Sequence, residues 1–563
     1  MVVDQAEEIT TRWSPNARIA PALIWVPLAL AGAYLIAVAI QFGQIVGATY
    51  LDADAASAPV IGQLYGGSPL HRDVVLGQMG WFSTLMFELA TRWLPLHRQI
   101  WEAAPYAMAL ASAALIAWGL WRVAGRWAAA VGATLVVCAA PHTLHLLFSL
   151  DDHSPTWFSL ALLAALLMLL ERPAGTPRTA WMLLVVVLVG AVVGANMASD
   201  TLLIGAGVLP FVLAAAGAFA LAPVRARLRP LGLALATVAV AAASDAFTLL
   251  LMRHENVTTP ANISHTGLAT AEELAHNFKL WWQSIAVLGN GEFFGQSLGF
   301  TSTLQLACAG LSIFAVAVLV PRVAWRELAG AFRTSRHDVP YERGASAGQA
   351  GPPSTLGERA PRIAWCVFWG SSAILLSVGF VVSSTPVDIF SDRYLVGLIY
   401  AAAALVPLLA GRSALRRAAV TAGAVVFAFT GLVSLVQGTV AGNPGHFPSY
   451  SVSAQVARIA RLEHITIGYA GYWDAAPITW ATRFAVKVYP VDACGARLCP
   501  FYLHYMSSWY TPRPGIRTFL ISDPTQPVPA PAVPVLGTPS AVYHVNELTM
   551  YVYPYDIASR MQT

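Results

Sequence analysis

Charged residues, and lysine above all, are scarce in this chain of 563 residues. Only 11% of the residues are charged, 57% are hydrophobic, and the mean hydropathy is +0.60. Soluble domains carry roughly a quarter charged residues, so this composition excludes an ordinary soluble protein and predicts a polytopic membrane protein. Lysine occurs only at Lys279 and Lys487. A net charge of +4 gives no argument for a nucleic-acid partner, and we expect none.

Cysteine is also sparse, and motifs for common cofactors are missing. The five cysteines form no CxxC pair and have no histidine nearby at metal-ligand spacing, which argues against a structural zinc site. The sequence contains no glycine-rich phosphate loop and no Rossmann fingerprint. Cys494 and Cys499 lie close together in a tail expected outside the cell, where a disulfide persists. The spacing leaves open whether they are bridged.

Long apolar runs are what the chain has in abundance. Between Ala20 and Gln437 we count about eleven runs, most of them close to the roughly 20 residues that cross a bilayer. Most arginines fall in one set of alternate loops, which the positive-inside rule assigns to the cytoplasm. An odd number of spans then predicts a cytoplasmic N-terminus and an extracytoplasmic C-terminal tail.

The distribution of apolar runs divides the chain into two parts. Residues 1–437 form the expected membrane module, with external loops at 42–104 and 252–300 and a cytoplasmic loop at 322–362. In 438–563 a helical pattern is followed by short alternating stretches, which are typical of strands. The fold class we predict is therefore an α-helical polytopic membrane protein with a small extracytoplasmic α/β domain.

Two segments of the external loops have an apolar stripe at helical spacing. The first lies between Gly77 and Pro95, and the second follows Thr270, which with Glu273 forms a capping-box pattern. Both are expected to be amphipathic helices at the membrane surface. We assign these stripes an anchoring role and no chemistry.

Three groups of ionisable residues are expected at the outer membrane face. They are Asp52 with Asp54, Asp151 with Asp152 and His153, and Asp388 with Asp392, Arg393 and Tyr394. Ionisable groups at that depth are costly unless they are solvated or paired, so they are functional candidates. One carboxylate can take a proton from an attacking hydroxyl while an arginine offsets the charge of a departing phosphate. This pattern suits transfer from a phosphate-linked donor.

Each group also has a purely structural interpretation. Asp52 and Asp54 fit the solvated end of a helix, Asp152 and His153 fit a helix cap, and Arg393 fits ordinary snorkelling of a long side chain. Two further carboxylates, Asp200 and Asp245, lie inside or beside apolar runs, and they are consistent with a transporter or lipid flippase.

The layout of acidic motifs, surface helices and tail domain resembles the GT-C superfamily of integral-membrane glycosyltransferases. That superfamily includes protein O-mannosyltransferases, lipid A aminoarabinose transferases and oligosaccharyltransferases. The resemblance rests on the acidic motif at Asp52 to Asp54, the second motif at Asp151 to His153, the loop after the seventh span and the tail domain. The stretch Gly468 to Ala475 looks like a segment in the tail domains of bacterial members.

The resemblance implies roles for the acidic residues. The first motif supplies the catalytic base, here Asp54 or Asp52, with Asp54 favoured although the Asp-Ala-Asp order leaves the choice open. The second motif, Asp151, Asp152 and His153, positions the donor or holds a metal. No cofactor is certain, but the resemblance leaves room for a divalent cation, Mg²⁺ or Mn²⁺, at these residues.

Together these observations predict a glycosyltransferase of the bacterial plasma (inner) membrane. We expect it to transfer a sugar, with inversion, from a polyprenyl-phosphate donor to a lipid, glycan or protein acceptor on the outer face. Arg393, with Lys279 or Arg253, is expected to hold the phosphate, and the external loop 252–300 to line the donor entrance. The alternatives are a transporter or lipid flippase, and a non-catalytic GT-C relative.

Overall fold

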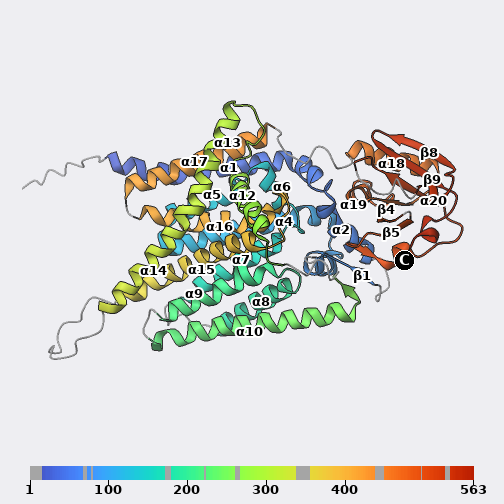
Figure 1. Ribbon diagram of the computed structural model, residues 1–563. Helices are drawn as coiled ribbons and strands as arrows, with labels where there is room; N and C mark the ends of the chain where they lie inside the picture. The colour runs from blue at the N-terminus through green and yellow to red at the C-terminus, as the bar shows by residue number, and fades with distance from the viewer. Residues whose placement is uncertain are drawn as a thin grey trace, which may run out of the picture.

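The computed structural model shows a long helical bundle with an α/β unit packed on one end (Figure 1). The ends of α14 and α15 that border the predicted cytoplasmic loop point away from that unit. The residues described are 15–66, 73–77, 80–171, 179–220, 224–259, 267–337, 355–411, 413–437, 449–495, 497–525 and 533–562.

The bundle is built from helices of very different lengths. The long ones are α1 (Pro15–Thr49), α4 (His97–Ala124), α8 (Thr179–Met197), α10 (Val224–His254), α12 (Ala271–Leu288), α14 (Val320–His337), α15 (Thr355–Val382) and α17 (Ala414–Val436). The shorter ones are α2 (Ala53–Gly66), α3 (Phe87–Thr91), α5 (Arg126–Val137), α6 (Pro141–Leu147), α7 (Ser154–Leu170), α9 (Leu209–Ala220), α13 (Phe300–Phe314) and α16 (Val396–Leu405). Turns of π- or 3₁₀-helix adjoin several of these at η1 (Trp81–Met86), η2 (Ile204–Val208), η3 (Ala315–Leu319), η4 (Ile389–Leu395) and η5 (Val406–Ala410).

Eight helical segments among the described residues are long and apolar enough to cross a membrane. A ninth results if α5 and α6 are counted as one broken span, and two further apolar helices, Ser154–Leu170 and Ile204–Ala220, are shorter. The helical, multi-pass character predicted from composition is therefore confirmed. The count of about eleven is not, because those two runs form helices shorter than a full crossing.

One apolar run is divided rather than continuous. The run from Trp127 to Phe148 is one of the roughly eleven runs counted above as single spans, but it forms two helices, α5 and α6, that meet at an angle of 90°. Pro141 occupies the first position of α6, and Ala140 before it is extended, with φ −66° and ψ 162°. A proline disfavours helical backbone in the residue before it, which explains the break.

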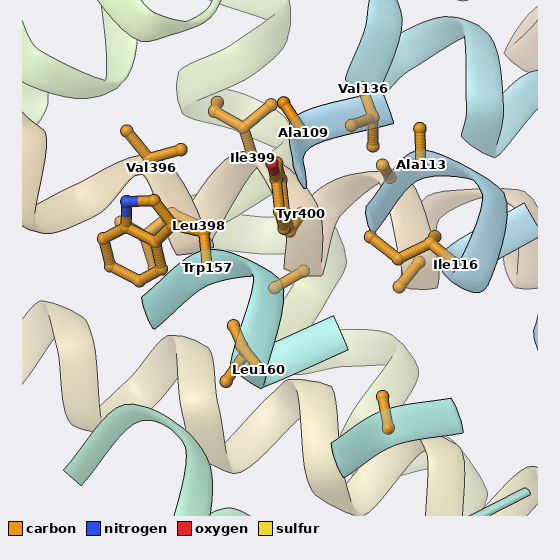
Figure 2. Close-up of a cluster of buried hydrophobic side chains, with 14 of the residues drawn as sticks. Ala109, Ala113, Ile116, Val136, Trp157, Leu160, Val396, Leu398, Ile399 and Tyr400 are labelled. Carbon is orange, nitrogen blue, oxygen red and sulfur yellow. The ribbon is translucent and has the colours of Figure 1, made fainter. Parts of the chain in front are cut away.

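The core of the bundle lies where α4, α5, α7 and α16 pack together. Figure 2 shows this cluster around Tyr400, with buried side chains from all four helices. Trp157 of α7 lies against Gly397 of α16, where a Cβ atom would come within 2.7 Å of the indole ring. Because α16 is buried on nearly every side, it fixes the position of the end of the η4 turn, which directly precedes it.

The C-terminal unit is a six-stranded mixed sheet with helices. Its strand order is β5-β4-β3-β7-β9-β8, with β3 parallel to both β4 and β7 and the remaining pairs antiparallel. The strands are β3 (Ile467–Ala470), β4 (Lys487–Cys494), β5 (Arg497–Pro500), β7 (Thr518–Ser522), β8 (Ala541–Val545) and β9 (Leu548–Tyr553). The helices are α18 (Tyr450–Leu462), α19 (Tyr472–Ala481) and α20 (Val533–Leu536), with 3₁₀ turns η6 (Ser507–Tyr510) and η8 (Ile557–Arg560). Cys494 and Cys499 are bridged, which answers the question that their spacing left open.

A small sheet links this unit to the bundle. Its order is β2-β1-β6, made from Val257–Thr258, Val74–Val75 and Tyr505–Met506. The three strands come from the two loops that were predicted to be external and from the C-terminal unit. Helix α19 also packs against α2, so the C-terminal unit is held directly over the first acidic motif.

The two amphipathic segments form helices, with one difference from the prediction. Thr270 and Glu273 make the expected capping box at the start of α12. In the first segment Glu88, placed on the polar face, is buried and accepts a hydrogen bond from the Trp101 indole at 3.1 Å. Trp93 is 77% exposed, so part of the predicted apolar stripe faces outward.

The predicted cytoplasmic loop 322–362 is only partly described. Helix α14 continues to His337 and α15 begins at Thr355, so both ends of the predicted loop are helical. Its middle, 338–354, lies outside the described residues, as does 438–448, where the predicted boundary between the two parts of the chain falls.

Candidate active site

Asp52 and Asp54 lie at the junction of α1 and α2 and have different partners. Asp52 caps α2, because its Oδ1 accepts a hydrogen bond from the Asp54 backbone N–H at 2.8 Å. Its other oxygen lies 3.7 Å from Nε2 of His145 on α6. Asp52 thus has a structural role at the start of α2, while the Asp54 side chain is available for other contacts.

Asp54 is held by two donors from distant parts of the chain. Its Oδ2 accepts from Nη1 of Arg393 at 3.1 Å, and its Oδ1 accepts from the hydroxyl of Tyr472 at 2.6 Å. Burial alone raises the pKa of Asp54, but Arg393 and Tyr472 outweigh it and hold this pKa below its usual value. The carboxylate therefore stays ionised, and its side chain is still 30% exposed.

The second acidic motif forms the turn between α6 and α7, and its three side chains diverge. Asp152 points toward Arg393, with Oδ1 at 3.7 Å from Nη1. Asp151 accepts a hydrogen bond from Ser83 of η1 at 3.2 Å. His153 has a left-handed backbone, with φ 64°, and its Nδ1 lies 2.7 Å from Oδ2 of Asp200. The side chains of three consecutive residues at this turn thus contact three different parts of the structure.

Burial dominates the electrostatics of this turn. It raises the pKa of Asp151 well above the usual value, and the charges of Asp54 and Asp152 add to the effect. Burial also raises the pKa of Asp152, although Arg393 opposes the shift. Asp200 behaves in the opposite way: burial is outweighed by His153 and Thr156, which keep its pKa low.

A cavity of about 980 Å³ lies between the bundle and the C-terminal unit. We call it the acidic cavity. From the bundle it is lined by Asp52, Asp54, His145, Leu146, Asp152, Thr385, Val387, Asp388, Phe390, Ser391, Arg393 and Tyr394. From the C-terminal unit it is lined by residues that include Tyr472, Trp473, Asp492, Phe501, Tyr502 and Thr525. The structure thus brings Asp52, Asp54, Asp152 and Arg393 to one space.

A second cavity, of about 420 Å³, adjoins the first. We call it the apolar cavity, because its walls include Leu202, Leu375, Leu376, Phe380 and Val382. Thr385 and Tyr394 line both cavities. Gly267 and Leu268, from the loop 252–300 that was predicted to be external, line the apolar cavity as well.

Other predicted site residues stand apart from the acidic cavity. His153 lines the apolar cavity instead, and Asp151 lines neither one. Arg253, at the end of α10, and Lys279, on α12, are both exposed and line neither cavity. Lys279 is turned away because the opposite side of α12, with Leu280 and Ser284, is buried against the bundle.

Among the residues of the acidic cavity that were not expected from the sequence, His145 and Tyr472 contact the first acidic motif. His145 lies in an apolar run and carries no motif, although a histidine in such a run is itself a weak signal. Tyr472 lies within the Gly468 to Ala475 stretch, whose resemblance to other tail domains was noted without a role. Both were missed because their importance comes from contacts with Asp52 and Asp54, far away along the chain.

The residues proposed to hold a divalent cation do not fit one. Asp151, Asp152 and His153 diverge toward Ser83, Arg393 and Asp200, so their oxygens and nitrogens do not surround a common point. Within the described ranges there is no group of three or more His, Cys, Asp or Glu residues arranged to bind a metal. Metal dependence stays an untested prediction.

No family model and no curated protein matches this chain. Among solved structures it is similar to the crystal structure of ArnT from Cupriavidus metallidurans in the apo state, with 12% identity, a TM-score of 0.43, and coverage of 95% of this chain and 100% of ArnT. It is also similar to the same ArnT bound to undecaprenyl phosphate, with 13% identity, a TM-score of 0.42, and coverage of 92% and 98%.

Proposed function

We propose that this protein is a membrane glycosyltransferase that moves a sugar from a polyprenyl-phosphate donor to an acceptor hydroxyl. The observation that carries the proposal is the junction of two unlike cavities. One is lined by carboxylates and an arginine. The other is lined mainly by apolar side chains, with His153 and Asp200 also in its wall, and the two cavities meet at Thr385 and Tyr394. A lipid-linked sugar phosphate has the same division into a polar head and an apolar chain.

In this proposal the phosphate of the donor binds in the acidic cavity and its isoprenoid chain in the apolar cavity. Arg393 is the cation that binds the phosphate, because it is the one arginine or lysine among the residues found to line the acidic cavity. The first isoprenoid units occupy the apolar cavity, beside Leu376 and Phe380. Gly267 and Leu268 border this path, in keeping with the expectation that the external loop 252–300 lines the donor entrance.

Asp54 is the group we assign as the base. The acceptor oxygen attacks C1 of the sugar, the bond from C1 to the phosphate oxygen breaks, and its electron pair leaves with polyprenyl phosphate. The acceptor proton passes to Asp54. Asp152, from the second acidic motif, contacts the same Arg393 guanidinium as Asp54. Attack from the face opposite the phosphate inverts the configuration at C1.

Arg393 couples donor binding to the strength of this base. In the structure Arg393 lowers the pKa of Asp54, which makes Asp54 a weak proton acceptor. A phosphate that draws Arg393 away removes this effect, and the pKa of Asp54 then rises toward the range useful for general-base catalysis. The base thus becomes effective once the donor is in place.

We further propose that both cavities open on the outer face of the plasma membrane, with the N-terminus in the cytoplasm. The C-terminal unit packs on the bundle end that holds the acidic cavity, and α14 with Arg322 and Arg326 extends from the other end (Figure 1). The positive-inside rule assigns the arginine-rich end to the cytoplasm.

The alternatives make different demands on the same residues. A non-catalytic relative requires the two acidic motifs to point to separate places, whereas Asp54 and Asp152 share Arg393. A transporter needs carboxylates within the spans that line a path. Asp245 lies within α10 but lines neither cavity, and Asp200 is held by His153 and Thr156. No observation favours either alternative over the transferase.

The test is transfer from a panel of polyprenyl-phosphate sugars by the full-length protein in purified membranes. Loss of a general base lowers rates about 10²- to 10⁴-fold, and we expect Asp54→Asn to fall in this range. Asp152→Asn should also lose activity, while Asp73→Asn, an exposed carboxylate of the same loop outside the cavity, should not. Full activity in both cavity variants would overturn the assignment of roles.

A further inference from the structure

The C-terminal unit contributes an aromatic wall to the acidic cavity. Trp473 is 39% exposed and Tyr502 is 47% exposed, although both are large rings, and both line the cavity. Phe501 and Tyr472 complete the wall and stack on one another, with ring centroids 4.5 Å apart and planes within 18°. Exposed aromatic rings gathered in a concave site are typical of ligand-binding surfaces.

The fold fixes the position of these rings. Trp473 lies in the first turn of α19, directly after β3, so the central part of the sheet sets its place. Tyr502 follows β5, whose pairing with β4 is closed by the Cys494–Cys499 disulfide. The backbone N–H of Phe501 donates to the Pro490 carbonyl at 3.2 Å, which ties the end of this hairpin to β4. A wall held in this way needs little reordering to bind a ligand.

The charges of the cavity select the kind of ligand. Its carboxylates are Asp52, Asp54, Asp152, Asp388 and Asp492, whereas its cationic side chains are Arg393 and, when protonated, His145. Arg393 is already engaged by Asp54 and Asp152. A second anion beside the donor phosphate would meet a surplus of negative charge, so the acceptor that fits is uncharged.

We propose that the aromatic wall is an acceptor subsite that binds a neutral glycan. This inference rests on the proposed transferase function and names the class of its acceptor. A sugar ring has a face of C–H bonds that packs on Trp473 and Tyr502, while its hydroxyls hydrogen-bond to carboxylates such as Asp492. An acceptor lipid tail would leave those carboxylates unsatisfied.

Tyr472 connects the wall to the proposed base. Its ring stacks on Phe501, and its hydroxyl donates to Oδ1 of Asp54 at 2.6 Å. A sugar that stacks beside this ring therefore has its hydroxyls near Asp54. The C-terminal unit thus takes part in the site by placing the acceptor.

The experiment measures binding separately from transfer. Full-length protein in nanodiscs is applied to an array of neutral hexose and pentose oligosaccharides, with uronic-acid and phosphorylated oligosaccharides of matched length. We expect binding to neutral glycans that weakens about five- to tenfold in Trp473→Ala and in Tyr502→Ala, in line with the energy of one aromatic contact. Trp473→Phe should keep most of the affinity, and Trp93→Ala, an exposed tryptophan outside the cavity, should keep all of it.

Asp54→Asn separates this inference from the proposed function. It should lose transfer and still bind the glycan, so a failure of transfer alone does not remove the subsite. Affinity unchanged in both Trp473→Ala and Tyr502→Ala would overturn the proposal. So would a preference for the anionic oligosaccharides, or the absence of binding to any neutral glycan while transfer to a peptide or lipid proceeds.

Discussion

The acidic cavity and the closed pair His153–Asp200, which lies in the wall of the apolar cavity, contain the same kinds of residue but differ in what their carboxylates can do. Asp200 is buried, with a side chain only 7% exposed, and it accepts hydrogen bonds from Thr156 and the Leu202 backbone as well as contacting His153. Asp54 also has two partners, yet its side chain is 30% exposed to a large cavity.

A second closed pair follows the same rule. His142 on α6 lies 2.7 Å from Asp392, which is fully buried at the start of the η4 turn. The next residue, Arg393, faces the cavity. Adjacent residues of one turn therefore serve the scaffold and the site. The type of residue does not distinguish a scaffold residue from a site residue. What distinguishes them is whether the side chain lines the acidic cavity.

The largest effect should come from Arg393→Gln, which removes the cation that joins the two acidic motifs. Asp54 and Asp152 then face each other uncompensated, and the donor phosphate has no guanidinium to bind. Loss of one preorganised charge-stabilising donor lowers rates about 10²- to 10³-fold, and we expect at least this loss in a transfer assay. Arg362→Gln is the matched control, because Arg362 pairs with Glu327 outside both cavities. Equal rates in the two variants would remove the distinction between site and scaffold arginines.

A substitution in the closed pair His153–Asp200 should mainly lower the free energy of unfolding. Asp200→Asn leaves His153 and Thr156 without their carboxylate in a buried place, and breaking a buried charged pair costs about 3–5 kcal/mol. The corresponding change at Asp54, which is more exposed, should cost clearly less. Thermal unfolding of the purified variants measures both losses. If Asp54→Asn destabilised the protein more than Asp200→Asn, the comparison would be reversed.

A smaller effect is expected from Tyr472→Phe, which removes one hydrogen bond and leaves the ring in place. The Tyr472 hydroxyl helps to lower the pKa of Asp54, so its loss raises that pKa. Because the base must be ionised, the acid limb of the pH–rate profile should move to higher pH. The rate at neutral pH should change by only about threefold. A profile identical to that of the wild type would show that Asp54 does not govern the acid limb.

The sequence predicts the local elements well, since they depend on neighbouring residues. Composition indicates a helical membrane protein, the alternating stretches within 438–563 include strands such as β3, and Thr270 with Glu273 caps a helix as expected. The apolar run around Pro141 was predicted as one span, although a proline before a short helix is a signal for the break that occurs there.

The site was predicted only in part, because it is assembled over long distances. Asp54 was identified as a candidate, but its partners Arg393 and Tyr472 lie 339 and 418 residues away in the sequence. Lys279 and Arg253 have the charge that a phosphate site needs, yet the packing of their helices leaves them exposed and outside both cavities. The charge of a residue can be read from a sequence, whereas the fold determines which charged side chains meet in one cavity.

The most direct test of the central claim follows the phosphorus of the donor. Purified full-length protein is incubated with a polyprenyl-phosphate sugar and acceptor glycans, and phosphorus NMR follows conversion of the phosphodiester into the phosphomonoester. We predict that the monoester accumulates with the wild type and with Asp73→Asn, and at least about 10²-fold more slowly with Asp54→Asn. A donor that stays a phosphodiester while it crosses between the leaflets of a vesicle would contradict transfer and identify a flippase.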